Sequence, residues 1–335
     1  MVQDSQLKAS NEKTTWRKLF WVAKLIVTLL ILSYIYKTFQ NEQKGVGDIG
    51  SVYSRILHEN HFSALLLMLF LVPVNWALES FKWQRLASKA VSITFREAFR
   101  GTLTGLAIGV AAPAQLGDTV GRVAALKSDD RLKAIGAAVV SNGIQFYVSL
   151  IFGGWGLARI GDKLGLDSSG KNGLYAILVF LLLLGFVIVL YRRRLTIWKP
   201  QKPLFTKALS YFQIIGSYTG ADLLVATTFG ILRYLVFLTQ FLLALSLFNF
   251  AMPLVDLAAC VALIFLAKTL IPAINVLGDL GLREFTALFV FKQYNLPAEQ
   301  VIAATFLVWI INVLGPILVG IFLIWKYKWR SLKRS

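Results

Sequence analysis

QVIAATFLVWIINVLGPILVGIFLIW, residues 300–325, contains no Asp, Glu, Lys or Arg. A helix needs about 20 predominantly apolar residues to cross the hydrocarbon core of a bilayer. Four other stretches are equally uncharged, namely residues 61–78, 134–158, 173–191 and 234–255. Residues 19–38 add another apolar stretch, with Lys24 near its start. These stretches predict an all-α polytopic membrane protein.

The overall composition agrees with this class. Hydrophobic residues make up 57% of the 335 residues and charged residues only 16%, whereas soluble domains carry about 25% charged residues. The chain has one cysteine, Cys260, which excludes an internal disulfide and disfavours a cysteine-based metal site. We therefore expect neither a metal nor a cofactor.

The formal net charge of +18 is concentrated at the ends of the apolar stretches. Residues 192–207 and 326–335 contain several Lys and Arg and no acidic residue, whereas residues 39–60 and 159–172 are nearly balanced. Short cytoplasmic loops of membrane proteins collect Lys and Arg. The distribution therefore indicates membrane topology and contact with anionic lipid rather than nucleic-acid binding. It places both termini in the cytoplasm of a multi-pass protein of the cell membrane.

Six full membrane spans follow from this charge rule. They form one transmembrane domain, residues 19–327, between a cytoplasmic N-terminal segment, residues 1–18, and a cytoplasmic basic tail, residues 328–335. A basic linker at residues 192–228 is expected to include an interfacial helix on the cytoplasmic face. The spans are predicted at about residues 19–38, 61–79, 134–158, 173–191, 229–250 and 299–326.

Two further apolar stretches, residues 97–126 and 254–292, do not fit as simple crossings. Each must return to the side from which it enters if the basic segments are to stay in the cytoplasm. We therefore predict two re-entrant helical hairpins that open to opposite sides. Repeat one, about residues 61–158, and repeat two, about residues 229–326, would then form an inverted repeat, an architecture that recurs in transporters.

The two hairpins contain a common heptapeptide pattern, LGDTVGR at residues 116–122 and LGDLGLR at residues 277–283. A proline precedes each copy, Pro113 and Pro272, and would end the preceding helix. Glycines in and around the copies would let the backbone turn closely; they are Gly117, Gly121, Gly278 and Gly281. The alternative is a chance match between two short patterns rich in Leu and Gly.

The charged residues of the motifs suggest an anion site. A half-helix that starts at a break points free N–H groups and a partial positive charge into the protein. Arg122 and Arg283 would reinforce that site, because a guanidinium matches the geometry of phosphate. Asp118 and Asp279 lie four residues before these arginines and can pair with them along one helix face. The alternative is that each motif is a charge-neutral helix cap without a ligand.

Other polar residues at membrane depth have expected roles. Glu284 and Lys268 add polar groups to the second anion site, although Lys268 can equally extend towards a membrane surface. Glu79, with Lys82 and Arg85, is expected to form a solvated salt-bridge cluster at the inner end of its span. Three amides inside spans are expected to make interhelical hydrogen bonds: Asn142, Gln145 and Asn312.

At the two motifs the chain resembles the flippase-like family that includes the transmembrane region of lysylphosphatidylglycerol synthases. One family pattern is a proline followed by Gly-acid and then Arg; the other is a proline followed by Gly-Gly-x-Gly-x-Arg-Glu. The matching residues are Pro113, Gly117, Asp118 and Arg122, and then Pro272, Gly278, Asp279, Gly281, Arg283 and Glu284. Asp118 stands where the family commonly has Glu, and Asp279 replaces a Gly. The resemblance extends over nearly the whole chain after about residue 15.

The resemblance implies lipid handling, and synthase chemistry is not expected because the sequence contains no soluble aminoacyl-transferase domain. We expect a non-enzymatic translocator or binding protein for an anionic or polyprenyl-phosphate-linked lipid, with two half-helix anion sites near the membrane midplane. No GxxxxGK[ST] nucleotide motif occurs. The alternatives are a membrane enzyme acting on lipid phosphates and a non-transporting accessory subunit of a lipid-modifying synthase. The expected partners are anionic membrane lipids and no nucleic acid; a homo-oligomer or a lipid-synthase partner is compatible with the sequence.

Overall fold

The computed structural model describes residues 62–110, 116–194, 209–248, 250–271 and 282–326, with isolated positions between residues 22 and 54. Every regular element within these ranges is helical, which confirms the predicted all-α class. The helices are α3 (Phe62–Ala87), α4 (Phe95–Gly109), α5 (Leu116–Ala124), α6 (Ile135–Ile160), α7 (Ser168–Tyr191), α10 (Ile214–Ser217), α11 (Gly220–Ser246), α12 (Leu254–Leu270), α13 (Leu282–Lys292), α14 (Ala298–Trp309) and α15 (Gly315–Lys326). Short turns of other helix types are η2 (Arg131–Ala134), η3 (Gly161–Lys163) and η4 (Ile310–Leu314).

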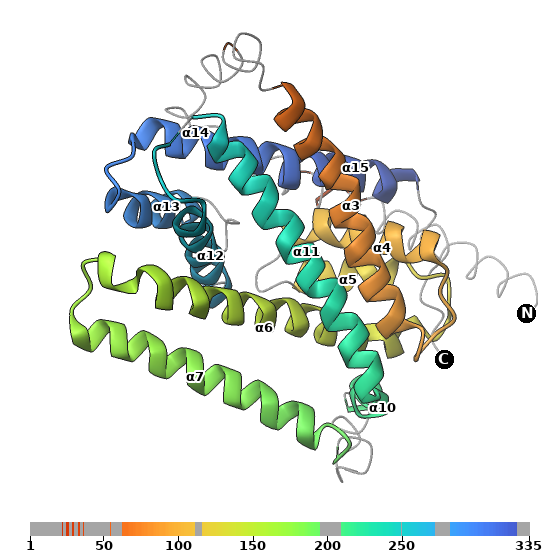
Figure 1. Ribbon diagram of the computed structural model, residues 1–335. Helices are drawn as coiled ribbons and strands as arrows, with labels where there is room; N and C mark the ends of the chain where they lie inside the picture. The colour runs from red at the N-terminus through yellow and green to blue at the C-terminus, as the bar shows by residue number, and fades with distance from the viewer. Residues whose placement is uncertain are drawn as a thin grey trace, which may run out of the picture.

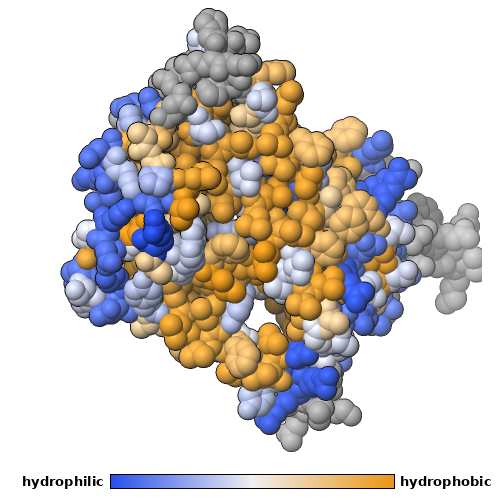
Figure 2. Space-filling model, viewed as in Figure 1, coloured by the Kyte–Doolittle hydropathy of each residue, from blue (hydrophilic) through white to orange (hydrophobic). Residues whose placement is uncertain are grey.

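Five helical stretches within these ranges are long and apolar enough to cross a membrane. They coincide with five of the six predicted spans, and the sixth, residues 19–38, lies largely outside the described residues. Helix α7 shows this character most plainly, because Leu178 is its one buried residue and the other apolar side chains remain accessible. Figure 2 shows hydrophobic residues across the middle of one face, with hydrophilic residues gathered at its left and right edges. The stretches are Phe62–Ala87, Arg131–Lys163, Ser168–Tyr191, Gly220–Ser246 and Ala298–Lys326.

Two of these helices extend beyond the uncharged stretches that predicted them. Helix α3 continues past Glu79, so the predicted cytoplasmic loop after this span begins inside the helix. Helix α11 begins at Gly220, because Thr219 and Asp222 form a capping box there. The predicted linker at residues 192–228 therefore ends inside α11, and the short helix α10 lies in its remaining part.

Two pairs of short helices lie between the long ones (Figure 1). The partners in each pair are antiparallel, as the contacts between their ends show. In the first pair, α4 and α5, the backbones touch. A Cβ atom added to Gly121 would lie 2.6 Å from the Gly105 Cα, and one added to Gly117 would lie 2.2 Å from the Ile108 carbonyl oxygen. Glycine is the residue that permits this approach. The second pair is α12 and α13.

The order of long helix, short pair and long helix occurs twice along the chain. It runs α3, α4–α5, α6 and then α11, α12–α13, α14–η4–α15. The breaks within the short pairs, residues 111–115 and 272–281, lie outside the described residues. The predictions for Pro113, Pro272, Gly278, Asp279 and Gly281 fall on these breaks and stay predictions.

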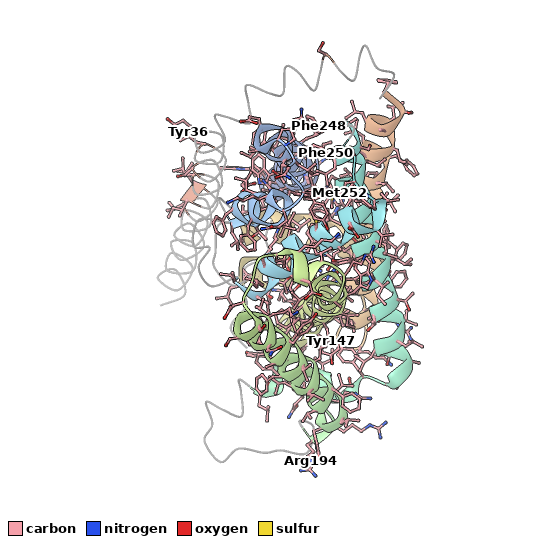
Figure 3. The ribbon with its side chains drawn as sticks, turned by 60° about the vertical axis from the view of Figure 1, so that its left-hand side comes forward. Tyr36, Tyr147, Arg194, Phe248, Phe250 and Met252 are labelled. Atoms are coloured by element: carbon pink, nitrogen blue, oxygen red, sulfur yellow. The ribbon has the colours of Figure 1, made fainter. Side chains whose placement is uncertain are left out.

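Close helix packing holds the long and short helices together. Helix α3 lies along α11, α6 along α12, and α4 against α15. Gly320 on α15 allows the last contact, since a Cβ there would lie 2.4 Å from the Leu103 carbonyl oxygen. Figure 3 shows Arg194 at one end of the molecule and Phe248 towards the other. Tyr147 lies between them and donates a hydrogen bond from α6 to a carbonyl of α7.

Candidate functional site

Glu79 on α3 is the centre of a buried network of charged side chains. Its own side chain is almost inaccessible to solvent. Its carboxylate lies 2.8 Å from Lys82 Nζ, 2.9 Å from Arg122 Nη1 and 3.2 Å from Arg233 Nε. The Ser141 hydroxyl donates a hydrogen bond to the same carboxylate at 3.3 Å. This one carboxylate therefore joins residues of α3, α5, α6 and α11. We call these residues, together with Asp118, the Glu79 network.

Asp118 and Arg122 on α5 extend the network. Arg122 Nε donates to both Asp118 oxygens, at 2.8 and 3.0 Å, and Asn142 Nδ2 donates to the same carboxylate at 3.2 Å. The Arg122 guanidinium also lies 5.7 Å from the centre of the Trp83 ring, within the range of a cation–π interaction. These contacts confirm the predicted pairing within the first heptapeptide and the interhelical role predicted for Asn142.

Helix periodicity explains how the sequence brings these groups together. Glu79 and Lys82 are three residues apart on α3, and Asp118 and Arg122 are four apart on α5, so each pair occupies one face of its helix. Asp118 lies in the first turn of α5 and Arg122 in the last, and both positions suit the helix dipole. Gly105 on α4 leaves room for the acid, because a Cβ there would lie 2.6 Å from Asp118 Oδ1.

The Glu79 network holds one more cation than carboxylate. Its cations are Lys82, Arg122 and Arg233, and its acids are Glu79 and Asp118. Arg122 Nη1 and Arg233 Nε lie at ion-pair distance from the Glu79 carboxylate. Neither nitrogen forms a hydrogen bond within the described residues. Excess charge away from water is costly unless an anion compensates it. The Arg233 side chain is 24% exposed, so an outside group can reach the network there.

The prediction of a solvated cluster at Glu79 is wrong. Glu79 and Lys82 are both buried, and Arg85 pairs with Asp222 instead. Helices α5, α6 and α11 supply this burial, and their approach is not visible in the pattern of a single span. Lys82 Nζ also donates to Gln145 Oε1 at 3.4 Å, which confirms the interhelical role predicted for Gln145.

Three residues of this site are not among those predicted from the sequence: Arg233, Ser141 and Trp83. Arg233 had a usable signal, because it is an ionisable residue within the predicted span at residues 229–250 and such a residue is a functional candidate by default. Ser141 and Trp83 had none, since serine and tryptophan are ordinary residues in membrane helices and their importance here depends on neighbours distant in sequence.

The second heptapeptide has different surroundings. Arg283 lies in the first turn of α13, where its guanidinium contacts the carboxylate of the adjacent Glu284. Arg283 and Lys268 line a narrow cavity of about 10 Å³ beside Trp309, which is space for about one water molecule. Lys268 and Arg283, the two cations predicted from the sequence for the second anion site, thus line the same cavity. The predicted pairing of Arg283 with Asp279 falls outside the described residues.

Asn312 does not make the interhelical hydrogen bond predicted for it. Its side-chain nitrogen and oxygen are both buried and have no hydrogen-bond partner among the described residues. It lies in η4, a π-helical turn between α14 and α15. Such turns widen the helix locally and occur frequently at functional sites. No polar side chain of the described neighbouring helices reaches this amide.

Two buried aspartates hold helix ends together away from the Glu79 network. Each lies in the first turn of its helix and meets an Arg and a Lys that are four residues apart on another segment. In the first, which we call the α3–α11 clamp, Asp222 lies 2.8 Å from Arg85 Nη2 and 3.2 Å from Lys89 Nζ. It joins the end of α3 to the start of α11.

The second, which we call the α6–α12 clamp, repeats this arrangement. Asp256 at the start of α12 lies 2.8 Å from Arg159 Nε and 2.8 Å from Lys163 Nζ. The Tyr294 hydroxyl donates to Asp256 at 3.3 Å, and burial raises the pKa of Tyr294 so that it stays a neutral donor. The clamp joins the end of α6 to both arms of the second short pair.

Metal-binding groups are sparse in the part of the chain that the structure describes. Within that part, no three His, Cys, Asp or Glu side chains gather where they could hold a metal ion. Cys260 is buried as a free thiol in α12. The chemistry of the described site is therefore that of buried ion pairs and amides.

A comparison with protein families places this chain in a known family. The family model described as the lysylphosphatidylglycerol synthase TM region matches residues 21–320. The matched range includes the Glu79 network, both short helix pairs and both clamps. No curated protein matches the chain.

Proposed function

Because the chain belongs to the family of the lysylphosphatidylglycerol synthase transmembrane region, we propose that it binds an anionic lipid and moves it between membrane leaflets. Family membership and the five candidate spans make it a multi-pass membrane protein with a lipid-related function. The proposed ligand is an anionic phospholipid or a polyprenyl-phosphate-linked lipid. The proposed role is binding and translocation without catalysis, with the lipid as partner.

The excess positive charge of the Glu79 network is the observation that carries this proposal. Lys82 and Arg122 are almost fully buried, yet the network has three cations for two carboxylates. A singly charged phosphodiester would balance it. Arg122 Nη1 and Arg233 Nε still have N–H groups that make no hydrogen bond in the described residues, and a guanidinium presents such groups in the fork that phosphate accepts.

Exchange of ionic partners gives a route for the head group. The carboxylates of Glu79 and Asp118 lie at ion-pair distance from the arginines. A phosphate that enters beside the partly exposed Arg233 would pair with the same cations as these carboxylates. No cation would then lose all of its ionic partners while the phosphate moves. Trp83 is fully buried beside Arg122, and an electrostatic contact is stronger where water is scarce.

The proposed topology places this network within the membrane. Basic residues put both termini, the α3–α4 connection and the segment before α11 in the cytoplasm. The pairs α4–α5 and α12–α13 would then be re-entrant hairpins that open to opposite sides of an inverted repeat. The repeated order of long and short helices supports this proposal. Transporters of this architecture bind their substrate near the midplane between the repeats.

A lipid-movement assay tests the proposal. The purified protein is reconstituted into vesicles with fluorescent phosphatidylglycerol, and a membrane-impermeant quencher measures how fast lipid changes leaflet. Arg233→Gln removes the excess charge and leaves the Lys82–Glu79 and Arg122–Asp118 pairs in place. We expect it to slow phosphatidylglycerol movement about tenfold, the effect of losing one charge-assisted hydrogen bond.

The matched control is Arg96→Gln, which removes an exposed cation of α4. It should leave the rate unchanged, and Arg233→Lys should restore part of it. If the folded Arg233→Gln variant moves lipid as fast as the unchanged protein, the network only holds the helices together and the proposed function is wrong. Phosphatidylcholine, which carries no net charge, should move more slowly in every variant.

A further inference from the structure

A second pocket lies outside both heptapeptide motifs. Its volume is about 240 Å³, and its lining residues come from α4, the end of α5 and the end of α15. Its lining combines two cations and a hydroxyl with apolar side chains. The cations are Arg100 and Lys326, the hydroxyl belongs to Thr104, and Phe322 and Ala125 are among the apolar residues.

The two cations of this pocket are not neutralised by the described residues around them. Neither Arg100 nor Lys326 forms an ion pair with an acid within the described ranges. The acid nearest to Arg100 along α4 is Glu97, whose carboxylate is bound to Thr94 in the capping box of that helix. Lys326 Nζ lies 5.5 Å from the centre of the Phe322 ring. The pocket therefore offers a net positive charge to a ligand.

The surface beside the pocket is apolar and faces outward. Leu318 and Phe322 are 53% and 61% exposed, and with Lys326 they follow one another at four-residue intervals along α15. Residues at this spacing share one face of a helix. This helix belongs to the candidate span Ala298–Lys326, so the exposed face adjoins hydrocarbon. A ligand that fits both parts has an anionic head and hydrocarbon chains.

We propose that this pocket binds the phosphate of an anionic phospholipid whose acyl chain lies along Leu318 and Phe322. Arg100 and Lys326 would bind the phosphate oxygens by charge-assisted hydrogen bonds, and the Thr104 hydroxyl lies in the same lining. The site differs from the Glu79 network. Gly101, the neighbour of Arg100, lies against the Arg122 backbone, so the α4–α5 pair separates the two. Binding here requires no lipid movement and does not depend on the proposed translocation.

Native mass spectrometry of the full chain tests this site, with phosphatidylglycerol titrated into the detergent-solubilised protein. The double variant Arg100→Gln with Lys326→Gln should weaken phosphatidylglycerol binding at least about tenfold, because two charge-assisted contacts are lost. Binding of phosphatidylcholine should change little. The charge-preserving variant Arg100→Lys with Lys326→Arg should keep most of the affinity, which separates loss of binding from loss of fold.

The matched control is Arg96→Gln with Arg194→Gln. It removes the same charge from another exposed α4 residue and from a cation over an aromatic ring at the end of another span. If this control weakens binding as much, general electrostatic attraction replaces the specific site and the inference fails. It also fails if the pocket variant binds normally.

Inorganic phosphate in excess should not compete with phosphatidylglycerol; if it does, the pocket is a site for free phosphate. A protein that binds phosphatidylglycerol here and moves none would refute translocation alone.

Discussion

The two heptapeptides share Leu-Gly-Asp and Arg, but their arginines lie at opposite ends of their helices. Arg122 ends α5, where the helix dipole favours a cation, and it meets the carboxylates of Asp118 and Glu79. Arg283 begins α13, where the dipole disfavours a cation, and it lines a cavity together with Lys268. Arg122 therefore shares two carboxylates with the other cations of the Glu79 network, whereas Arg283 contacts the carboxylate next to it in sequence and lines a cavity with a lysine.

This difference shows what a spacing rule can and cannot predict. An acid four residues before an arginine predicts a pair when both belong to one helix, as Asp118 and Arg122 do. Within the described residues, the helix that carries Arg283 begins at Leu282, so Asp279 lies outside them and its pairing stays a prediction. What differs between the two motifs is the position of the arginine, near the end of α5 and near the start of α13.

The largest expected effect comes from removing the central acid. Glu79→Gln leaves Lys82, Arg122 and Arg233 without their shared carboxylate, and we expect a loss of about 3–5 kcal/mol in the free energy of unfolding. Glu284→Gln should cost less, because the Glu284 side chain is more accessible to water, 10% exposed against 3% for Glu79. Thermal unfolding in detergent, read by circular dichroism, measures both.

The control for this comparison is Glu97→Gln, in a capping box at the molecular surface. It should cost only about 1 kcal/mol. Equal losses for Glu79→Gln and Glu284→Gln would mean that the two halves hold their cations in the same way, and the contrast between the two motifs would fail.

The Glu79 network also shows why much of the fold, and less of the site, is predictable from sequence. Uncharged stretches predict the spans because the bilayer imposes length and composition. They misplace helix ends where polar residues continue the helix, as at Glu79 on α3 and at the capped start of α11. The Asp118–Arg122 pair can be predicted from the sequence, because its members are four residues apart on one helix. The approach of Arg233 to Glu79 cannot be predicted in this way, because it joins two helices that are distant in sequence.

The next effect concerns the backbone contact that places α5 against α4. Gly121→Ala would put a Cβ 2.6 Å from the Gly105 Cα, and such overpacking costs about 1–3 kcal/mol. Gly143→Ala on α6 is the matched control, because nothing lies within 4 Å of its added Cβ. Alanine there should be neutral or stabilise by up to about 1 kcal/mol. Thermal unfolding of both variants measures the difference; equal stabilities would show that α4 and α5 are not in close contact.

A smaller effect is the coupling within each motif. A double-mutant cycle of Asp118→Asn and Arg122→Gln should give about 0.5–3 kcal/mol of coupling between the two residues, since they are in direct contact. The same cycle with Asp279→Asn and Arg283→Gln should give less, because Arg283 already contacts Glu284. Unfolding midpoints of the single and double variants provide the data. If the coupling is equal in the two motifs, Asp279 and Arg283 pair as strongly as Asp118 and Arg122 do.

The smallest effects belong to the clamps, where the two halves of the chain are alike. Asp222→Asn and Asp256→Asn each remove a buried acid that holds an Arg and a Lys in partly exposed positions. Water can solvate these cations once the acid is neutral, so we expect a loss of only about 1 kcal/mol at each clamp. The loss should shrink in high salt, which screens exposed charges, whereas the loss from Glu79→Gln should not. Unfolding measured at low and high salt tests this order. A salt-resistant loss of several kcal/mol at one clamp, but not at the other, would show that the two clamps differ as much as the surroundings of the two motifs do.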